Sequence, residues 1–312
     1  CSVLSSASWA ATLNVCGTCA YKTINEAYSA ATSGDTIAVA AGTYTEGLTI
    51  EKDLTLTGAG SATTTIEATS NNVIRVQLGA SAVEISGFKL VSGSGNERAI
   101  RITSNAVLTL DDMDLSNFTP TIRGGALSLG SGSEIIGSNL TMDGNVGALE
   151  GGAINCYQGT LTLTNSTISR SSGEGYGGAV RLYECTASFD TVGFSDNVVD
   201  FSSEPRAIGG ALYAYNSTVT IADSSFTGNE TEEDGGAIGS IDSTLNITNS
   251  TFTANFAEDD GGAMYNPGPS TGSWSISDST FTGNVANAST ASSSGGHISG
   301  GGALWNAGTD VI

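Results

Sequence analysis

Two acidic turns are the residues of this chain best suited to bind a metal ion. Residues 232–234 and 258–260 each supply three carboxylates before a glycine, and the two segments begin 26 residues apart. Like charges stacked one repeat apart repel unless they are solvated or bridged, and Ca²⁺ prefers several oxygen ligands. A solvated acidic ridge explains the same residues without a ligand, so both interpretations stay open. The calcium ligands that we expect are Glu232, Asp234, Glu258 and Asp260.

Aromatic and arginine side chains form a second candidate site. Alternation along one strand of each repeat places Tyr213, Tyr265, Trp305 and Arg181 on the outside. Flat rings that face outward suit a sugar or a partner protein, although such rings can also simply stack on one another. We therefore expect surface glycans or other protein subunits as partners.

The same outward positions carry no carboxylate. Glycosidase chemistry needs two carboxyl groups roughly 5–10 Å apart. Asp111, Asp112 and Asp114 have no acidic counterparts in the neighbouring repeats, and the only histidine, His297, lies in a Ser/Gly-rich insertion. These residues predict that the chain is not an enzyme.

A repeat must position these side chains. The motif Gly-Gly-Ala followed by an aliphatic residue occurs seven times, mostly at intervals of 26 or 27 residues, and Phe-x-x-Asn recurs in step with it at Phe194, Phe226, Phe252 and Phe281. A fixed period in this range is typical of a solenoid. Each repeat contains three short runs that alternate apolar and polar residues, with turn-forming residues between them and no helical pattern. The sequence thus predicts an all-β, right-handed parallel β-helix with three strands per coil and about ten coils. The Phe and Asn residues would then stack as interior ladders.

The N-terminal segment predicts a cap for this solenoid. Thr23 and Glu26 form a capping box, followed by one apolar helical face that Gly34 can end. We expect a cap over residues 1–34 and a β-helix over residues 35–312 that continues beyond residue 312.

The cap and first coil resemble a known superfamily. Residues 21–27 (YKTINEA) and 33–44 (SGDTIAVAAGTY) are similar to the entry segment of pectin-lyase-like right-handed β-helix proteins. The Gly-Gly-Ala and Phe-x-x-Asn repeats resemble those of the polymorphic outer membrane protein family, which are adhesins. The second resemblance implies a non-enzymatic, extracellular structural or adhesive rod in a surface or filament assembly, with end-to-end or lateral self-assembly. The first implies the alternative, a carbohydrate-active enzyme or a lectin-like carbohydrate-binding module.

The net charge of the chain limits the classes of partner that it can bind. The chain holds 31 acidic and 10 basic residues, a net charge of −21. This excludes nucleic acid and disfavours anionic membranes and polyanionic pectate, because all of these need clustered cations or a bridging metal. No apolar run reaches the ~18 residues of a membrane span. Apart from calcium, we expect no cofactor.

Cysteines and sequons point to an extracellular protein. We expect an N-terminal disulfide that joins Cys1 to Cys16 or Cys19, while a bridge between Cys156 and Cys185 stays open. Several Asn-x-Ser/Thr sequons are expected to carry glycans, although the repeat also creates such triplets by chance. The expected glycosylation sites are Asn139, Asn165, Asn216, Asn246, Asn249 and Asn287.

Overall fold

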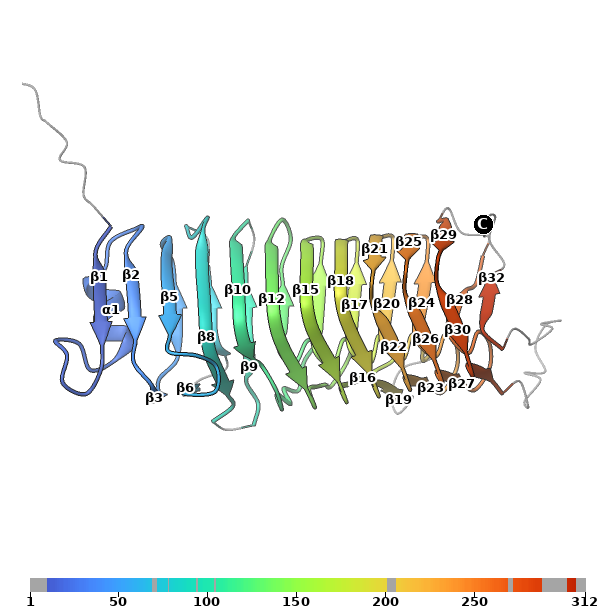
Figure 1. Cartoon of the computed structure of the whole chain (residues 1–312), viewed down its shortest axis with the longest axis horizontal. Coiled ribbons are helices and arrows are strands. Elements are labelled where there is room, and N and C mark those ends of the chain that lie inside the picture. Colours follow the sequence, from blue (N-terminus) through green and yellow to red (C-terminus); the bar gives the residue numbers. More distant parts are fainter. Residues whose placement is uncertain are drawn as a thin grey trace, which may run out of the picture.

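The chain forms a right-handed parallel β-helix (Figure 1). This computed structural model describes residues 10–68, 72–77, 79–93, 95–103, 105–200, 206–268, 272–287 and 302–306. Within them, three parallel sheets of sixteen, ten and six strands run along the long axis of the rod, and one short helix lies at the N-terminal end. The predicted fold class is confirmed.

The ten-stranded sheet contains one strand from each coil. Its strands are β4 (Leu48–Ile50), β7 (Asn72–Val76), β9 (Arg98–Ile102), β11 (Leu127–Leu129), β14 (Ile154–Tyr157), β17 (Val180–Tyr183), β20 (Leu212–Tyr215), β24 (Ile238–Ile241), β28 (Met264–Asn266) and β32 (Leu304–Asn306).

The sixteen-stranded sheet covers a second side of the rod. Its strands are β1 (Thr12–Val15), β2 (Thr36–Val39), β3 (Gly42–Thr45), β5 (Leu54–Gly58), β6 (Thr64–Glu67), β8 (Val83–Val91), β10 (Val107–Asp114), β12 (Glu134–Asp143), β15 (Thr160–Ser169), β18 (Thr186–Ser195), β21 (Thr218–Ala222), β22 (Ser225–Thr227), β25 (Thr244–Thr248), β26 (Thr251–Thr253), β29 (Trp274–Ser277) and β30 (Thr280–Thr282). The six-stranded sheet consists of β13 (Val146–Gly147), β16 (Ser172–Glu174), β19 (Val198–Asp200), β23 (Glu230–Thr231), β27 (Phe256–Ala257) and β31 (Val285–Ala286).

The inward columns follow the predicted register. In the ten-stranded sheet, Leu127 pairs with Ile154, which pairs with Val180, and the same column continues in both directions. These side chains are fully buried, so each packs on its counterpart in the next coil. The core is therefore a set of stacked aliphatic columns, because no single coil can bury its own apolar face.

Two ladders of stacked side chains run through the interior of the C-terminal half. Phe226 and Phe252 stack with ring centroids 4.8 Å apart, and Phe281 continues the stack at 4.6 Å. Beside them, the Asn229 side-chain amide donates to the Asn255 side-chain oxygen at 2.9 Å, and Asn255 donates to Asn284 at 2.8 Å. Both ladders were predicted, and both are confirmed.

The second and third predicted strands run together in several coils. In β12, β15 and β18 they form one strand that bends at a single left-handed residue. The same column has φ between 46° and 57° in seven coils, at Asp112, Asn139, Asn165, Thr191, Asp223, Asn249 and Asp278. Asn and Asp tolerate this conformation best, which accounts for the Asn/Asp column in the sequence.

The predicted helix is confirmed as α1 (Ile24–Ala30). The Glu26 backbone N–H donates to the Thr23 hydroxyl, and the Glu26 carboxylate accepts from the Thr23 N–H, which completes the capping box. Ile24 and Ala27 are buried against the first coils. Strand β1, before the helix, pairs with β2 and so extends the sixteen-stranded sheet.

The disulfides differ from the predicted pairing. Cys16 bonds to Cys19, so the expected bridge from Cys1 to either of them is wrong; Cys1 itself lies outside the described residues. Cys156 bonds to Cys185, which follows β17 in the next coil. Since Cys156 is fully buried, this bridge joins two coils inside the rod.

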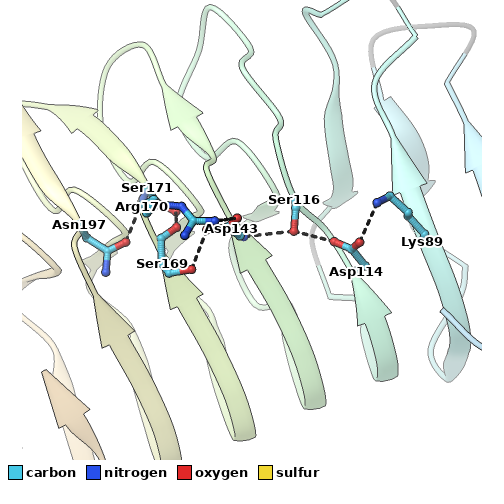
Figure 2. A network of polar contacts seen from close by, with 8 residues as sticks. All are labelled: Lys89, Asp114, Ser116, Asp143, Ser169, Arg170, Ser171 and Asn197. Carbon is cyan, nitrogen blue, oxygen red and sulfur yellow. Dashed lines mark hydrogen bonds and ion pairs between the residues drawn. The ribbon is translucent and has the colours of Figure 1, made fainter. Parts of the chain in front are cut away.

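Polar side chains join successive coils along the sixteen-stranded sheet (Figure 2). Lys89 pairs with Asp114 at 3.0 Å, the Ser116 hydroxyl donates to Asp114, and the Ser169 hydroxyl donates to Asp143 at 2.7 Å. Arg170 also pairs with Asp143. Each of these polar groups therefore has a partner within the fold, and the contacts link neighbouring coils along this sheet.

Candidate functional site

The outer face of the ten-stranded sheet concentrates the cations of an acidic chain. The sequence contains seven arginines, and all but Arg170 lie on this face or in the turn that leads into it. Arg75 on β7, Arg101 on β9 and Arg181 on β17 occupy one outward column, with Ser128 and Asn155 between Arg101 and Arg181. A local positive strip thus runs along a rod of strongly negative net charge.

A buried carboxylate organises the middle of this strip. Glu150 precedes a Gly-Gly pair and is 7% exposed; its Oε2 lies 2.5 Å from Nε of Arg123 and 2.6 Å from Nε of Arg181. The second contact is ionic, because Nε of Arg181 makes no hydrogen bond. Burial lowers the pKa of Arg181, and Glu150 opposes this shift. Arg181 also donates to the Asn155 side-chain oxygen at 3.1 Å. Two arginines therefore share one carboxylate.

The N-terminal part of the strip has excess positive charge. Nε of Arg98 donates to the Arg123 carbonyl at 2.8 Å, and burial together with the charge of Arg101 lowers the pKa of Arg98 to about 10. Arg101 is exposed, and within the described part of the chain it forms no ion pair. Nε of Arg75 is buried without a hydrogen-bond partner. These guanidinium groups can accept an anion.

A tyrosine ladder occupies the next outward column. Tyr157, Tyr183 and Tyr215 lie in register on β14, β17 and β20. The ring centroids of Tyr157 and Tyr183 are 5.5 Å apart, and those of Tyr183 and Tyr215 are 5.0 Å apart. The Arg181 guanidinium lies 4.9 Å from the centre of the Tyr183 ring. The arginine column and the tyrosine ladder are therefore in contact.

A second group of buried polar side chains lies farther toward the C-terminus. Asp234 and Asp260 precede Gly-Gly pairs in adjacent coils, are each 5% exposed, and are linked by the Asp260 N–H, which donates to Oδ1 of Asp234 at 3.2 Å. Arg206 lies 3.4 Å from Oδ2 of Asp234. Burial raises the pKa of Asp234 to about 7, against the opposing effect of Arg206. A carboxyl group with this pKa can donate a proton near neutral pH.

The predicted aromatic surface is wrong in part. Tyr213 and Tyr265 do point away from the core, but they are only 6% and 2% exposed. Tyr176 stacks against Tyr213, and Ile208 packs against both tyrosines, because the residue before each Gly-Gly pair folds over the neighbouring strand. Trp305 is half-buried and stacks on Tyr265 at 5.0 Å. Of the four predicted residues, Arg181 belongs to the site described above.

The four predicted calcium ligands do not converge. Glu232 and Glu258 are exposed, whereas Asp234 and Asp260 are buried. In the described part of the chain, no group of three or more His, Cys, Asp or Glu side chains could hold a metal ion. The described residues therefore offer no calcium site.

The sequence alone did not single out Glu150, and it indicated Asp234 and Asp260 only as calcium ligands and not as part of this face. The predicted face consisted only of outward strand positions, whereas Glu150, Asp234 and Asp260 reach it from the turn before each Gly-Gly pair. The β-bridges that link Glu150, Tyr176, Ile208 and Asp234 show that this turn position is itself a stacked column. The signal was available, because every one of these residues directly precedes Gly-Gly.

The predicted glycosylation sites are accessible. Asn139, Asn165, Asn216, Asn246, Asn249 and Asn287 are all exposed, whereas the sequon residue Asn229 is fully buried in the ladder. Glycosylation of these six exposed residues remains a prediction. His297 lies outside the described residues.

Comparison with known proteins identifies related folds. No family model and no curated protein matches this chain. A pectin methylesterase from Erwinia chrysanthemi is 12% identical, with 88% of this chain and 89% of that chain covered and a TM-score of 0.44. A pectin methylesterase from Aspergillus niger is 17% identical (89% and 87% covered, TM-score 0.40). The catalytic domain of a GH87 α-1,3-glucanase, in complex with nigerose, is 11% identical (87% and 64% covered, TM-score 0.45).

These comparisons correct the expected function. The comparisons contradict the prediction of a non-enzymatic structural or adhesive rod, since the three similar structures are all carbohydrate-active enzymes. The resemblance to the polymorphic outer membrane protein family is not shown either. At these identities the likeness concerns the fold alone, a parallel β-helix. Separately, no helix in the described residues is long and apolar enough to span a membrane.

Proposed function

We propose that this chain is a carbohydrate-active protein that binds an acidic polysaccharide along the outer face of its ten-stranded sheet. The observation that carries the proposal is the arginine strip: Arg75, Arg98, Arg101, Arg123 and Arg181 gather on one face of a chain whose net charge is −21. Arginine suits this role because its planar fork matches a carboxylate or sulfate.

The charge distribution favours an anionic ligand at this face only. The remainder of the rod repels polyanions, whereas Arg101 is exposed and Nε of Arg75 is buried without an acceptor. The exposed guanidinium of Arg101 is therefore available to an acid group of a ligand. This accounts for the accumulation of positive charge in an acidic protein.

The shape of the strip favours a linear polymer. The outward column from Arg75 to Arg181 crosses five successive strands of the sheet, which corresponds to about 19 Å at the usual strand spacing. Ser128 and Asn155 lie within the same column and offer hydrogen-bonding groups to sugar hydroxyls. A single small anion would leave most of this column unused.

Calorimetric titration tests the proposal. The probes are an α-1,4-linked hexamer of galacturonic acid and maltohexaose, an uncharged α-1,4-linked hexamer of the same length. We expect the acidic hexamer to bind more tightly, and Arg101→Gln to weaken it by about tenfold, the equivalent of one charge-assisted hydrogen bond. Arg170→Gln is the matched control, because Arg170 lies on the sixteen-stranded sheet and pairs with Asp143. Equal affinity of the wild type for both probes, or equal loss in both variants, would contradict the proposal.

Cleavage of a bound glycan is a second candidate function. Asp234 and Asp260 lie in adjacent coils, whose backbones are about 5 Å apart, and this backbone spacing is near the carboxyl separation of retaining glycosidases. Asp234, with its pKa raised to about 7, suits the general acid, and Asp260 the nucleophile. The test measures new reducing ends in polysaccharide digests with the wild type, Asp234→Asn and Asp260→Asn. Activity that survives both substitutions would rule out this pair.

We infer that the protein works outside the reducing cytosol. Two disulfides, Cys16–Cys19 and Cys156–Cys185, support this location, because such bonds persist in oxidising compartments. Thiol titration of the denatured, unreduced protein should find at least four cysteines oxidised, namely Cys16, Cys19, Cys156 and Cys185.

A further inference from the structure

The tyrosine ladder has one open end. Its column continues on the C-terminal side with Ile241, which pairs with Tyr215 and covers that end. On the N-terminal side, Leu129 pairs with Cys156, so the next residue, Gly130, lies one coil before Tyr157. Gly130 N donates to the Ile102 carbonyl at 3.1 Å, just as Thr103 N donates to the Val76 carbonyl at 3.0 Å, so the parallel ladder extends to this position.

The exposure of the rings agrees with this arrangement. Tyr157 is 44% exposed, whereas Tyr183 and Tyr215 are half-buried. In a stack, each inner ring has both faces covered by its neighbours, and only an end ring retains an open face. Gly130 has no side chain, so this column places no side chain beside Tyr157 at that rung, which we call the vacant rung.

From this we propose that the open face of Tyr157 above Gly130 is a subsite that stacks one pyranose ring of the ligand, with the acid group of that sugar directed to Arg101. The inference rests on the proposed function and assigns one position of the polymer to one side chain. A flat apolar ring suits the face of a sugar, and the ladder spacing of 5.0–5.5 Å leaves room for one ring in the vacant rung.

Neighbouring side chains complete the subsite. Arg101 pairs with Ser128, which lies two residues before Gly130 on the same outward side. Arg101 is thus a diagonal neighbour of the vacant rung, about 7–8 Å from it, within reach of a long side chain. Ser128 and Asn155 follow Arg101 in the adjacent column, in the coils of Gly130 and Tyr157, and can contact ring hydroxyls.

Tyr157→Ala tests the subsite with the galacturonic acid hexamer and calorimetry described above. We expect an affinity loss of about five- to tenfold, and Tyr157→Phe should stay within about twofold of the wild type because it keeps the ring. Tyr215→Ala is the matched control, since it removes the same side chain at the covered end of the ladder and should change affinity by less than about twofold.

A second variant tests the vacancy without removing the aromatic ring. The φ angle of Gly130 is not in the left-handed region, so Gly130→Val introduces no left-handed strain, and its methyl groups lie in the column beside Tyr157. We expect this variant to fold and to bind the acidic hexamer as weakly as Tyr157→Ala does.

The outcomes separate the subsite from the proposed function. If the wild type fails to bind the acidic hexamer, both the proposed function and the proposed subsite are wrong. If binding depends on Arg101 but survives both Tyr157→Ala and Gly130→Val, only the subsite is wrong. Loss in both variants, with retention in Tyr215→Ala, supports it.

Discussion

The phenylalanine ladder gives the sharpest prediction of how the rod is stabilised. Phe252 is fully buried, and its ring lies between Phe226 at 4.8 Å and Phe281 at 4.6 Å, with interplanar angles of 3° and 5°. Burial of a phenylalanine side chain contributes about 1.5–3 kcal/mol, and the cavity left by its removal adds to the loss. We therefore expect Phe252→Ala to lower the free energy of unfolding by about 3–5 kcal/mol.

Urea titration followed by circular dichroism measures this loss. Phe281→Ala is the matched control: Phe281 ends the described ladder, is only half-buried and has one stacked phenylalanine neighbour. Its loss should be about half as large, because less apolar area is buried there. Hydrogen exchange should also accelerate first in β22, β26 and β30, since coils stabilise only their neighbours. An unchanged free energy for Phe252→Ala, or equal losses in both variants, would refute an interior column held by stacking.

Three further predictions concern polar groups. Asn229→Ala should cost about 3 kcal/mol of unfolding free energy, because it leaves the Asn197 amide and the Asn255 oxygen without a ladder partner inside the core, and a urea titration within error of the wild type would contradict this. In the native state the pKa of Asp234 is raised from 3.8 to about 7, so the folded protein binds the extra proton and its stability should fall as pH rises from about 4 to 7. Asp234→Asn should remove that part of the pH dependence, on the order of 4 kcal/mol, and parallel stability profiles for the two proteins would contradict the assignment. Glycopeptide mapping of the secreted protein should find sugar on exposed Asn246 and none on buried Asn229, and the reverse pattern would contradict the inside–outside assignment.

The interior of this fold could be predicted from the sequence because its columns repeat. Leu127, Ile154 and Val180 alternate with polar residues and recur at the coil period, so both their direction and their partners follow from counting. The Asn229–Asn255 ladder follows in the same way, since an inward amide between glycine-rich turns needs a neighbour in the next coil.

The outer face could be predicted only in part, because alternation gives direction and not exposure. Tyr213 points outward as expected, yet Ile208 and Tyr176 cover it from the turn before Gly-Gly. Likewise, Glu150 reaches Arg181 from one coil away, and no spacing within a single repeat indicates that contact. Cys16 and Cys19 bond to each other rather than to Cys1, a choice that sequence spacing leaves open.

Hydroxyl-radical footprinting with and without the galacturonic acid hexamer tests directly whether an acidic polysaccharide binds the outer face of the ten-stranded sheet. We expect protection on the outer face of β7, β9 and β14, at Arg75, Arg101 and Tyr157, and no change around Arg170 on the sixteen-stranded sheet. Protection centred on the sixteen-stranded sheet, or no protection at saturating hexamer, would contradict it.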